Sequence, residues 1–130
     1  MRRLAGAMPP EPELVTAHGD FHRAQLLRVQ GRLVVLDVDA MCLAAPALDV
    51  AEYASGAVDG DEAGWEAAEA VLDGLLEAYG SRPAGLEWHL ANALVVRASH
   101  PFHRLLPSWP DRIEAMLGIA ETALAHGRRP

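Results

Sequence analysis

Thr16-Ala-His-Gly-Asp-Phe-His-Arg-Ala-Gln25 is the stretch that decides the fold of this chain, together with Val34-Val-Leu-Asp-Val-Asp39 further along. Between them lies Leu26-Leu-Arg-Val-Gln-Gly-Arg-Leu-Val-Val-Leu36, in which two apolar, partly β-branched runs flank Gln30-Gly31. Glycine can adopt the positive φ that a tight hairpin turn needs, so this segment predicts a β-hairpin. The hairpin would bring its two outer ends together.

Oxygen-bearing side chains stand at both outer ends of this predicted hairpin. Asp20 and Gln25 precede it, and Asp37 follows it. Carboxylate and amide oxygens at one rim suit a hard cation such as Mg²⁺. Asp39 could add a further carboxylate ligand, although an ordinary surface acid explains this residue equally well.

Three separated elements resemble one known family. His18-Gly-Asp20, with an amide five residues after the aspartate, resembles the catalytic loop of aminoglycoside and related small-molecule phosphotransferases. Leu36-Asp37 is similar to the metal-binding aspartate of that family. Pro46-Ala-Leu-Asp49-Val-Ala is similar to the start of its downstream helix. The order and spacing match over residues 13 to 55, and the remainder matches only in its helical character.

The resemblance implies ATP-dependent transfer of a phosphoryl group to a hydroxyl of a small molecule. Asp20 would be the catalytic base. His18 would order the catalytic loop through a hydrogen bond to the backbone, and Asp49 would support the loop from behind. Gln25 and Asp37 would bind Mg²⁺ and, with it, ATP. The acceptor could be cationic, as aminoglycosides are.

The chain departs from the family pattern in three respects. Gln25 stands where Asn is usual, and Ala44-Ala45 stand where Gly-Asp is frequent. The 11 basic residues are all arginine, whereas kinases of this type hold ATP with a lysine beneath a glycine-rich loop. Neither is present. We therefore expect residues 1–130 to form a single domain, the C-terminal lobe of a phosphotransferase, inactive without the nucleotide-binding lobe.

The expected fold class is α+β and helix-rich, a protein-kinase-like C-terminal lobe with one β-hairpin and about four helices. Apolar periodicity and capping residues predict helices over 46–56, 62–79, 86–99 and 108–127. Prolines at 9, 10 and 12 suggest an extended lead-in over residues 1–13. The side chains expected to face the core recur at helical spacing: Trp65, Ala68, Leu72, Leu75, Leu76, Tyr79, Ile113, Met116, Leu117, Ala120 and Leu124.

Composition narrows the function classes. With 18 acidic and 11 basic residues the net charge is −7, which argues against nucleic acid and anionic membranes as partners. No apolar run is long enough to span a bilayer. The single Cys42 excludes an internal disulfide, fits a cytoplasmic location and is expected to be a small core residue. Hydrophobic residues make up 51% of the chain, so a lone lobe would expose apolar surface and could self-associate.

Three further interpretations stay open. His18-x-Asp20-x-His22 could bind zinc, because alternate residues of an extended segment point to one side. Five acids at helical spacing form an acidic stripe, either a solvated helix face or a wall that attracts a cationic acceptor: Glu62, Glu66, Glu69, Asp73 and Glu77. The alternative to an enzyme is a non-catalytic remnant that acts as a binding or interaction module.

Overall fold

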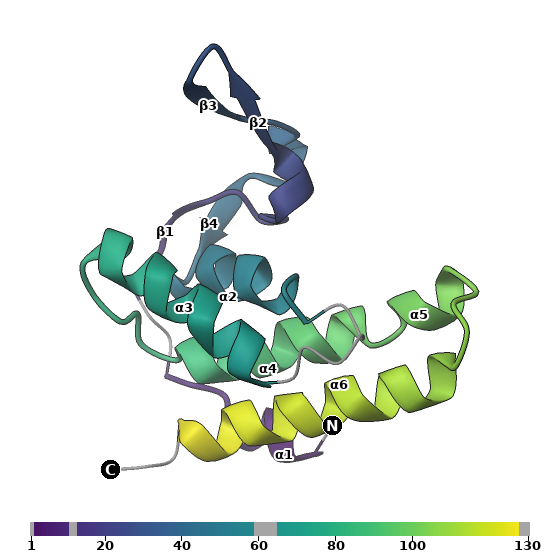
Figure 1. The fold of residues 1–130 in the computed structure, drawn as a ribbon. Coiled ribbons are helices and arrows are strands. Elements are labelled where there is room, and N and C mark those ends of the chain that lie inside the picture. Colours follow the sequence, from purple (N-terminus) through teal and green to yellow (C-terminus); the bar gives the residue numbers. More distant parts are fainter. Residues whose placement is uncertain (1, 11–12, 59–64, 128–130) are drawn as a thin grey trace.

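A helical body and a small layer of strands make up the molecule (Figure 1). The structure, a computed structural model, describes residues 2–10, 13–58 and 65–127. Over these ranges the chain is α+β and rich in helix, as the sequence predicts. None of the helices described there is long and apolar enough to cross a membrane.

Four longer helices form the body, close to where the sequence predicts them: α2 (Ala47–Ser55), α3 (Trp65–Tyr79), α4 (Leu86–Arg97) and α6 (Trp109–His126). Helix α4 contacts both α2 and α6 and lies between them (Figure 1). Its apolar stripe of Leu86, Leu90 and Leu94 is fully buried. Burial of one leucine side chain contributes about 1.5–3 kcal/mol, so this stripe is the main source of cohesion.

The predicted core positions are confirmed only in part. Ala68, Leu72, Met116 and Ala120 are buried, but Tyr79 and Leu117 are exposed, so that expectation is wrong for both. Leu117 lies about 100° around the helix from the buried Met116, which turns it away from α4. The start of the predicted helix at residues 62–64 lies outside the described residues.

The N-terminal segment corrects the expectation of an extended lead-in. Residues Arg2–Ala5 form a short helix, α1, and Leu4 is buried in the core cluster of the body. The indole Nε1 of Trp88 donates a hydrogen bond to the Leu4 carbonyl oxygen at 2.8 Å. The prolines begin only at Pro9, so they do not oppose a helix that ends at Ala5. A tertiary contact decides this conformation.

The predicted hairpin is confirmed. Strands β2 (Leu26–Val29) and β3 (Arg32–Val35) pair antiparallel, with Leu26 opposite Val35. Both turn residues have positive φ, 48° at Gln30 and 80° at Gly31, as a two-residue hairpin loop requires. The hairpin extends away from the helical body (Figure 1), and its apolar side chains are exposed except that of Leu26, which is half-buried.

A second strand pair was not predicted. Strand β1 (Val15–Ala17) pairs antiparallel with β4 (Cys42–Ala44). Cys42 is exposed, so its expected place in the core is wrong. A three-residue strand has little sequence signal, and its partner here lies far away along the chain. The pair brings the His18-Gly19-Asp20 motif back to the segment that leads into α2.

Candidate functional site

Asp49 fixes the loop that carries the candidate base. Its carboxylate accepts hydrogen bonds from the backbone N–H of His18 at 2.7 Å and from that of Gly19 at 3.0 Å. Asp49 lies in the first turn of α2, where the helix dipole favours a negative charge. The carboxylate therefore joins the strand layer to the helical body immediately before Asp20.

The ring of His18 orders the same loop through hydrogen bonds to the backbone. Its Nε2 lies 2.8 Å from the Leu36 carbonyl oxygen, and its Nδ1 lies 3.4 Å from the backbone nitrogen of Asp20. A carbonyl oxygen only accepts, so Nε2 carries the proton and Nδ1 is free to accept from the Asp20 N–H. The ring thus connects the end of the hairpin to the loop.

Gly19 permits a close approach that no other residue could make. Its φ is +85°, and a Cβ at this position would overlap the carbonyl oxygen of Ala40. The motif therefore needs glycine at this point for two reasons, the left-handed backbone and the missing side chain.

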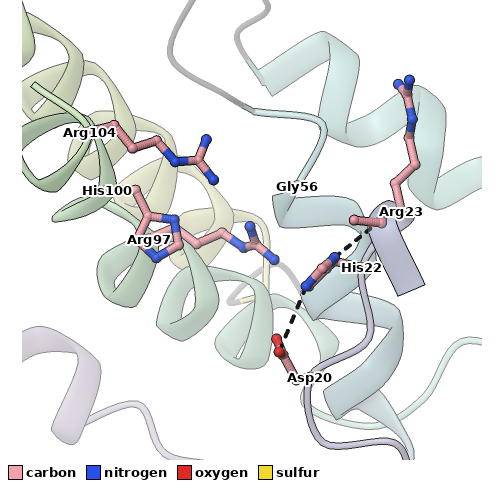
Figure 2. Close-up of a pocket in the computed structure, with 8 residues that line it drawn as sticks. Asp20, His22, Arg23, Gly56, Arg97, His100 and Arg104 are labelled. Atoms are coloured by element: carbon pink, nitrogen blue, oxygen red, sulfur yellow. Dashed lines mark hydrogen bonds and ion pairs between the residues drawn. The ribbon is translucent and has the colours of Figure 1, made fainter. Parts of the chain in front are cut away.

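Asp20 projects from this fixed loop with 56% of its side chain exposed. Its Oδ2 lies 3.7 Å from Nε2 of His22, as Figure 2 shows. The Nδ1 atom of His22 accepts a hydrogen bond from the Ala24 N–H at 3.2 Å. This bond places the proton of a neutral His22 on Nε2, so that N–H can face the Asp20 carboxylate.

The hairpin brings Gln25 and Asp37 together. Gln25 ends a short 3-10 helix, Arg23–Gln25, and its side chain is buried. Its amide Nε2 donates to Asp37 Oδ2 at 3.2 Å and lies 3.4 Å from His22 Nε2. Asp37 has left-handed backbone angles, φ 55° and ψ 60°, an unusual conformation that aspartate tolerates better than most residues. The turn after β3 therefore aims this carboxylate at the amide.

The Gln25–Asp37 pair fits a magnesium ion in its donor chemistry. Mg²⁺ is commonly held by one or two protein oxygens, with waters and phosphates completing its shell. Turning the Gln25 amide over would place its oxygen beside Asp37. The same change would let that oxygen accept from the Nε2–H of His22, whereas the amide nitrogen cannot. His22 therefore favours the orientation in which the Gln25 oxygen could bind an ion, whereas Asp37 favours the amide nitrogen unless a cation lies between the two oxygens.

The zinc interpretation of His18-x-Asp20-x-His22 is not supported. Both ring nitrogens of His18 are engaged with backbone groups. No cluster of three or more His, Cys, Asp or Glu side chains suited to a metal exists among the described residues. Asp39 is exposed in the short 3-10 helix Val38–Ala40.

An open cavity of about 800 Å³ lies beside Asp20, and three of its eight described lining residues are arginines (Figure 2). Its wall consists of Asp20, His22, Arg23, Ala24, Gly56, Arg97, His100 and Arg104. Arg97 is the last residue of α4, while His100 opens the short helix α5 (His100–His103) and Arg104 follows it. None of these arginines is predicted from the sequence to belong to the site.

Arg97 and Glu52 form an ion pair at the edge of this cavity. The Nη2 of Arg97 lies 3.7 Å from Glu52 Oε2, and both side chains are largely buried. Burial raises the pKa of Glu52, Arg97 opposes that rise, and the nearby Asp20 and Asp49 add to it. One signal in the sequence could have found Arg97. Arg97 follows the buried Leu94 by three residues and so lies next to the apolar face of the helix. A charged residue at such a position is unusual and marks a candidate for a specific role.

The acidic stripe lies elsewhere. Glu66, Glu69, Asp73 and Glu77 are exposed on α3 and do not line the cavity, whereas Glu62 lies outside the described residues. The stripe is therefore a solvated helix face over its described part. The wall next to Asp20 carries arginines instead.

Comparisons with family models, with curated proteins and with solved structures found no match to this chain. The residues of the site and their geometry are therefore what bears on its function.

Proposed function

We propose that this chain is the catalytic-loop lobe of an ATP-dependent phosphotransferase that acts on a hydroxyl of a small molecule. One observation carries the proposal, a line of contacts from the candidate base to the candidate metal ligand. Asp20 lies 3.7 Å from His22, His22 lies 3.4 Å from Gln25, and Gln25 lies 3.2 Å from Asp37. Phosphoryl transfer needs a carboxylate and oxygen ligands in such proximity.

Asp20 would act as the general base. It would accept the proton of the acceptor hydroxyl while that oxygen attacks the γ-phosphorus of ATP, and the bond to the β–γ bridging oxygen would break to release ADP. The exposed Asp20 carboxylate opens onto the cavity, where an acceptor can reach it. Bound Mg²⁺ would neutralise phosphate charge, and Gln25 and Asp37 would hold it. Asp49 and His18 would keep the loop rigid.

A nucleotide-binding lobe has to complete such a site, because the sequence contains no lysine and no glycine-rich loop. Apolar side chains support a docking surface for that lobe on the strand layer. Leu33 and Val35 are exposed on one face of the hairpin and Leu27 on the other, and Met41 and Leu43 are exposed at β4 and its entry. Residues 1–130 are therefore expected to turn over no ATP by themselves.

A non-catalytic binding module is the second candidate function, and the same exposed apolar strands favour it. The two functions differ in what they require of Asp37. A binding module needs no metal ligand there, whereas a phosphotransferase loses its metal site when Asp37 is removed.

The metal site can be tested on the 130-residue chain with Mn²⁺ and ADP. Paramagnetic Mn²⁺ should broaden the amide NMR signals of Gln25 and Asp37 in the native chain. Asp37→Ala should abolish that broadening. Asp39→Ala removes an exposed acid two residues away and should leave it intact. Equal broadening in both variants would argue against the proposed metal site.

The chemistry can be tested once a nucleotide-binding lobe is supplied in the same polypeptide. Asp20→Ala should lower kcat by roughly 10²-fold or more while nucleotide binding stays nearly unchanged. Gln25→Asn should retain activity, because it preserves the ligand type. Unchanged kcat in Asp20→Ala would leave the binding module as the better proposal.

A further inference from the structure

The described wall of the cavity beside Asp20 presents arginines, which do not suit a polycationic acceptor. Its described wall contains three arginines, Arg23, Arg97 and Arg104, and one acid, Asp20. In Figure 2 the side chain of Arg23 extends away from the other two arginines, so the guanidinium groups nearest the space beside Asp20 are those of Arg97 and Arg104. The chain as a whole is acidic, with a net charge of −7. Arginines are therefore concentrated at this cavity although acidic residues outnumber basic ones in the chain as a whole.

Arg97 is held in place but retains capacity to bind a ligand. Its side chain is only 15% exposed, and its separation of 3.7 Å from Glu52 exceeds hydrogen-bond length. The Glu52 contact thus positions the guanidinium without saturating its donors. Partial burial strengthens the interaction of such a group with an anion, because the surroundings screen charge less than water does.

Arg104 and His100 face the same space as Arg97 across the break between α4 and α5 (Figure 2). Guanidinium groups match the planar oxygens of carboxylates and phosphates, to which they can donate two parallel hydrogen bonds. A cavity of about 800 Å³ has room for a small metabolite. Gln25 and Asp37 do not line it, so the candidate metal pair lies outside this space.

We propose that the acceptor carries an anionic group, a phosphate or a carboxylate, which the arginines of this cavity bind while its hydroxyl faces Asp20. This inference rests on the proposed phosphotransferase function and names the substrate class of that site. The phosphates of the nucleotide are the other source of the same chemistry, and the test separates the two.

Calorimetric titration of the 130-residue chain with glycerol 3-phosphate, glycerol, spermidine and ADP tests the inference. Glycerol 3-phosphate should bind at least about tenfold more tightly than glycerol or spermidine. Arg104→Gln should weaken that binding about tenfold, while Arg28→Gln, an exposed arginine on β2, should not change it. Asp20→Asn should strengthen it, because a like charge is removed. Thermal melts establish that each variant is folded.

Three outcomes would overturn the inference. Equal affinity for glycerol 3-phosphate in Arg104→Gln and Arg28→Gln would do so, and so would tighter binding of spermidine. The third is binding of ADP that depends on Arg104 without binding of glycerol 3-phosphate, which assigns the arginines to the nucleotide. Asp37→Ala separates the two proposals, since it should spare glycerol 3-phosphate binding and abolish the Mn²⁺ effect. Arginine-dependent anion binding without any Mn²⁺ effect in the native chain would retain the anion site and reject the phosphotransferase.

Discussion

The helical body and the strand layer use apolar residues in opposite ways. In the body, the leucines of α4 are completely buried between α2 and α6. In the hairpin, the apolar side chains have no such cover, and Leu33 is 67% exposed. The chemistry-bearing residues lie on the strand layer and its loops, fastened to the body through Asp49. Asp20, Gln25 and Asp37 therefore lie apart from the buried leucines, while the cavity beside Asp20 takes residues from both regions.

The largest difference between the regions should appear on truncation of one leucine in each. Leu90→Ala should lower the free energy of unfolding by about 3–5 kcal/mol, because it opens a cavity in a fully buried position. Leu33→Ala should change it by less than about 0.5 kcal/mol, as exposed positions usually do. Urea denaturation followed by circular dichroism measures both. Similar losses would mean that the hairpin packs against another surface in solution.

Two glycines with nearly the same backbone angle φ, Gly19 and Gly31, provide the next comparison. Gly19→Ala should cost about 2–4 kcal/mol, since it adds an overlap with Ala40 to the strain of a left-handed residue. Gly31 has a similar φ, but a methyl group added there would lie in open space. Gly31→Ala should therefore lower the free energy of unfolding by only about 1 kcal/mol. Thermal unfolding of both variants measures the difference. Equal costs would show that the approach of the loop to Ala40 is not tight.

The link between the regions can be broken at Asp49. Asp49→Ala removes the acceptor of two backbone hydrogen bonds and should cost about 2 kcal/mol. Amide hydrogen exchange at His18 and Gly19 should accelerate, while exchange in α4 should respond only to the overall loss of stability. Asp39→Ala, an exposed acid in the strand layer, is the matched control. Unchanged protection of His18 and Gly19 would contradict the role assigned to the carboxylate.

The smallest effect concerns pH and arises in the helical body. Burial lowers the pKa of the half-buried His89 on α4. As pH falls, the unfolded chain therefore protonates His89 before the folded chain does. The free energy of unfolding is highest above the ordinary His pKa of 6.5 and decreases as pH falls below that value. The loss should stay under about 1 kcal/mol, because the ring remains partly solvated. His89→Gln should flatten the profile of unfolding free energy against pH between pH 7 and 5.

Features that depend on neighbouring residues in the chain could be predicted from the sequence. The Gln30-Gly31 turn fixed the hairpin, because positive φ at both residues is a local demand. Helix ends were predicted well where glycine or proline marks them, as at Gly56, Gly80 and Gly127. The proximity of Gln25 and Asp37 followed from the hairpin itself, since a two-residue turn sets the register.

Only the tertiary structure decided the features that need distant partners. Strand β4 exists because β1 pairs with it, and α1 exists because Leu4 and Trp88 meet across the body. The charge of the cavity is also of this kind. Arg23 and Arg97 lie far apart in the sequence, and separate elements bring them to one wall with Asp20. The sequence by itself therefore determined the candidate catalytic loop and the proximity of Gln25 and Asp37, because both are local. The cationic wall arises from the packing of α4 and α5 beside that loop, for which local patterns carry no signal.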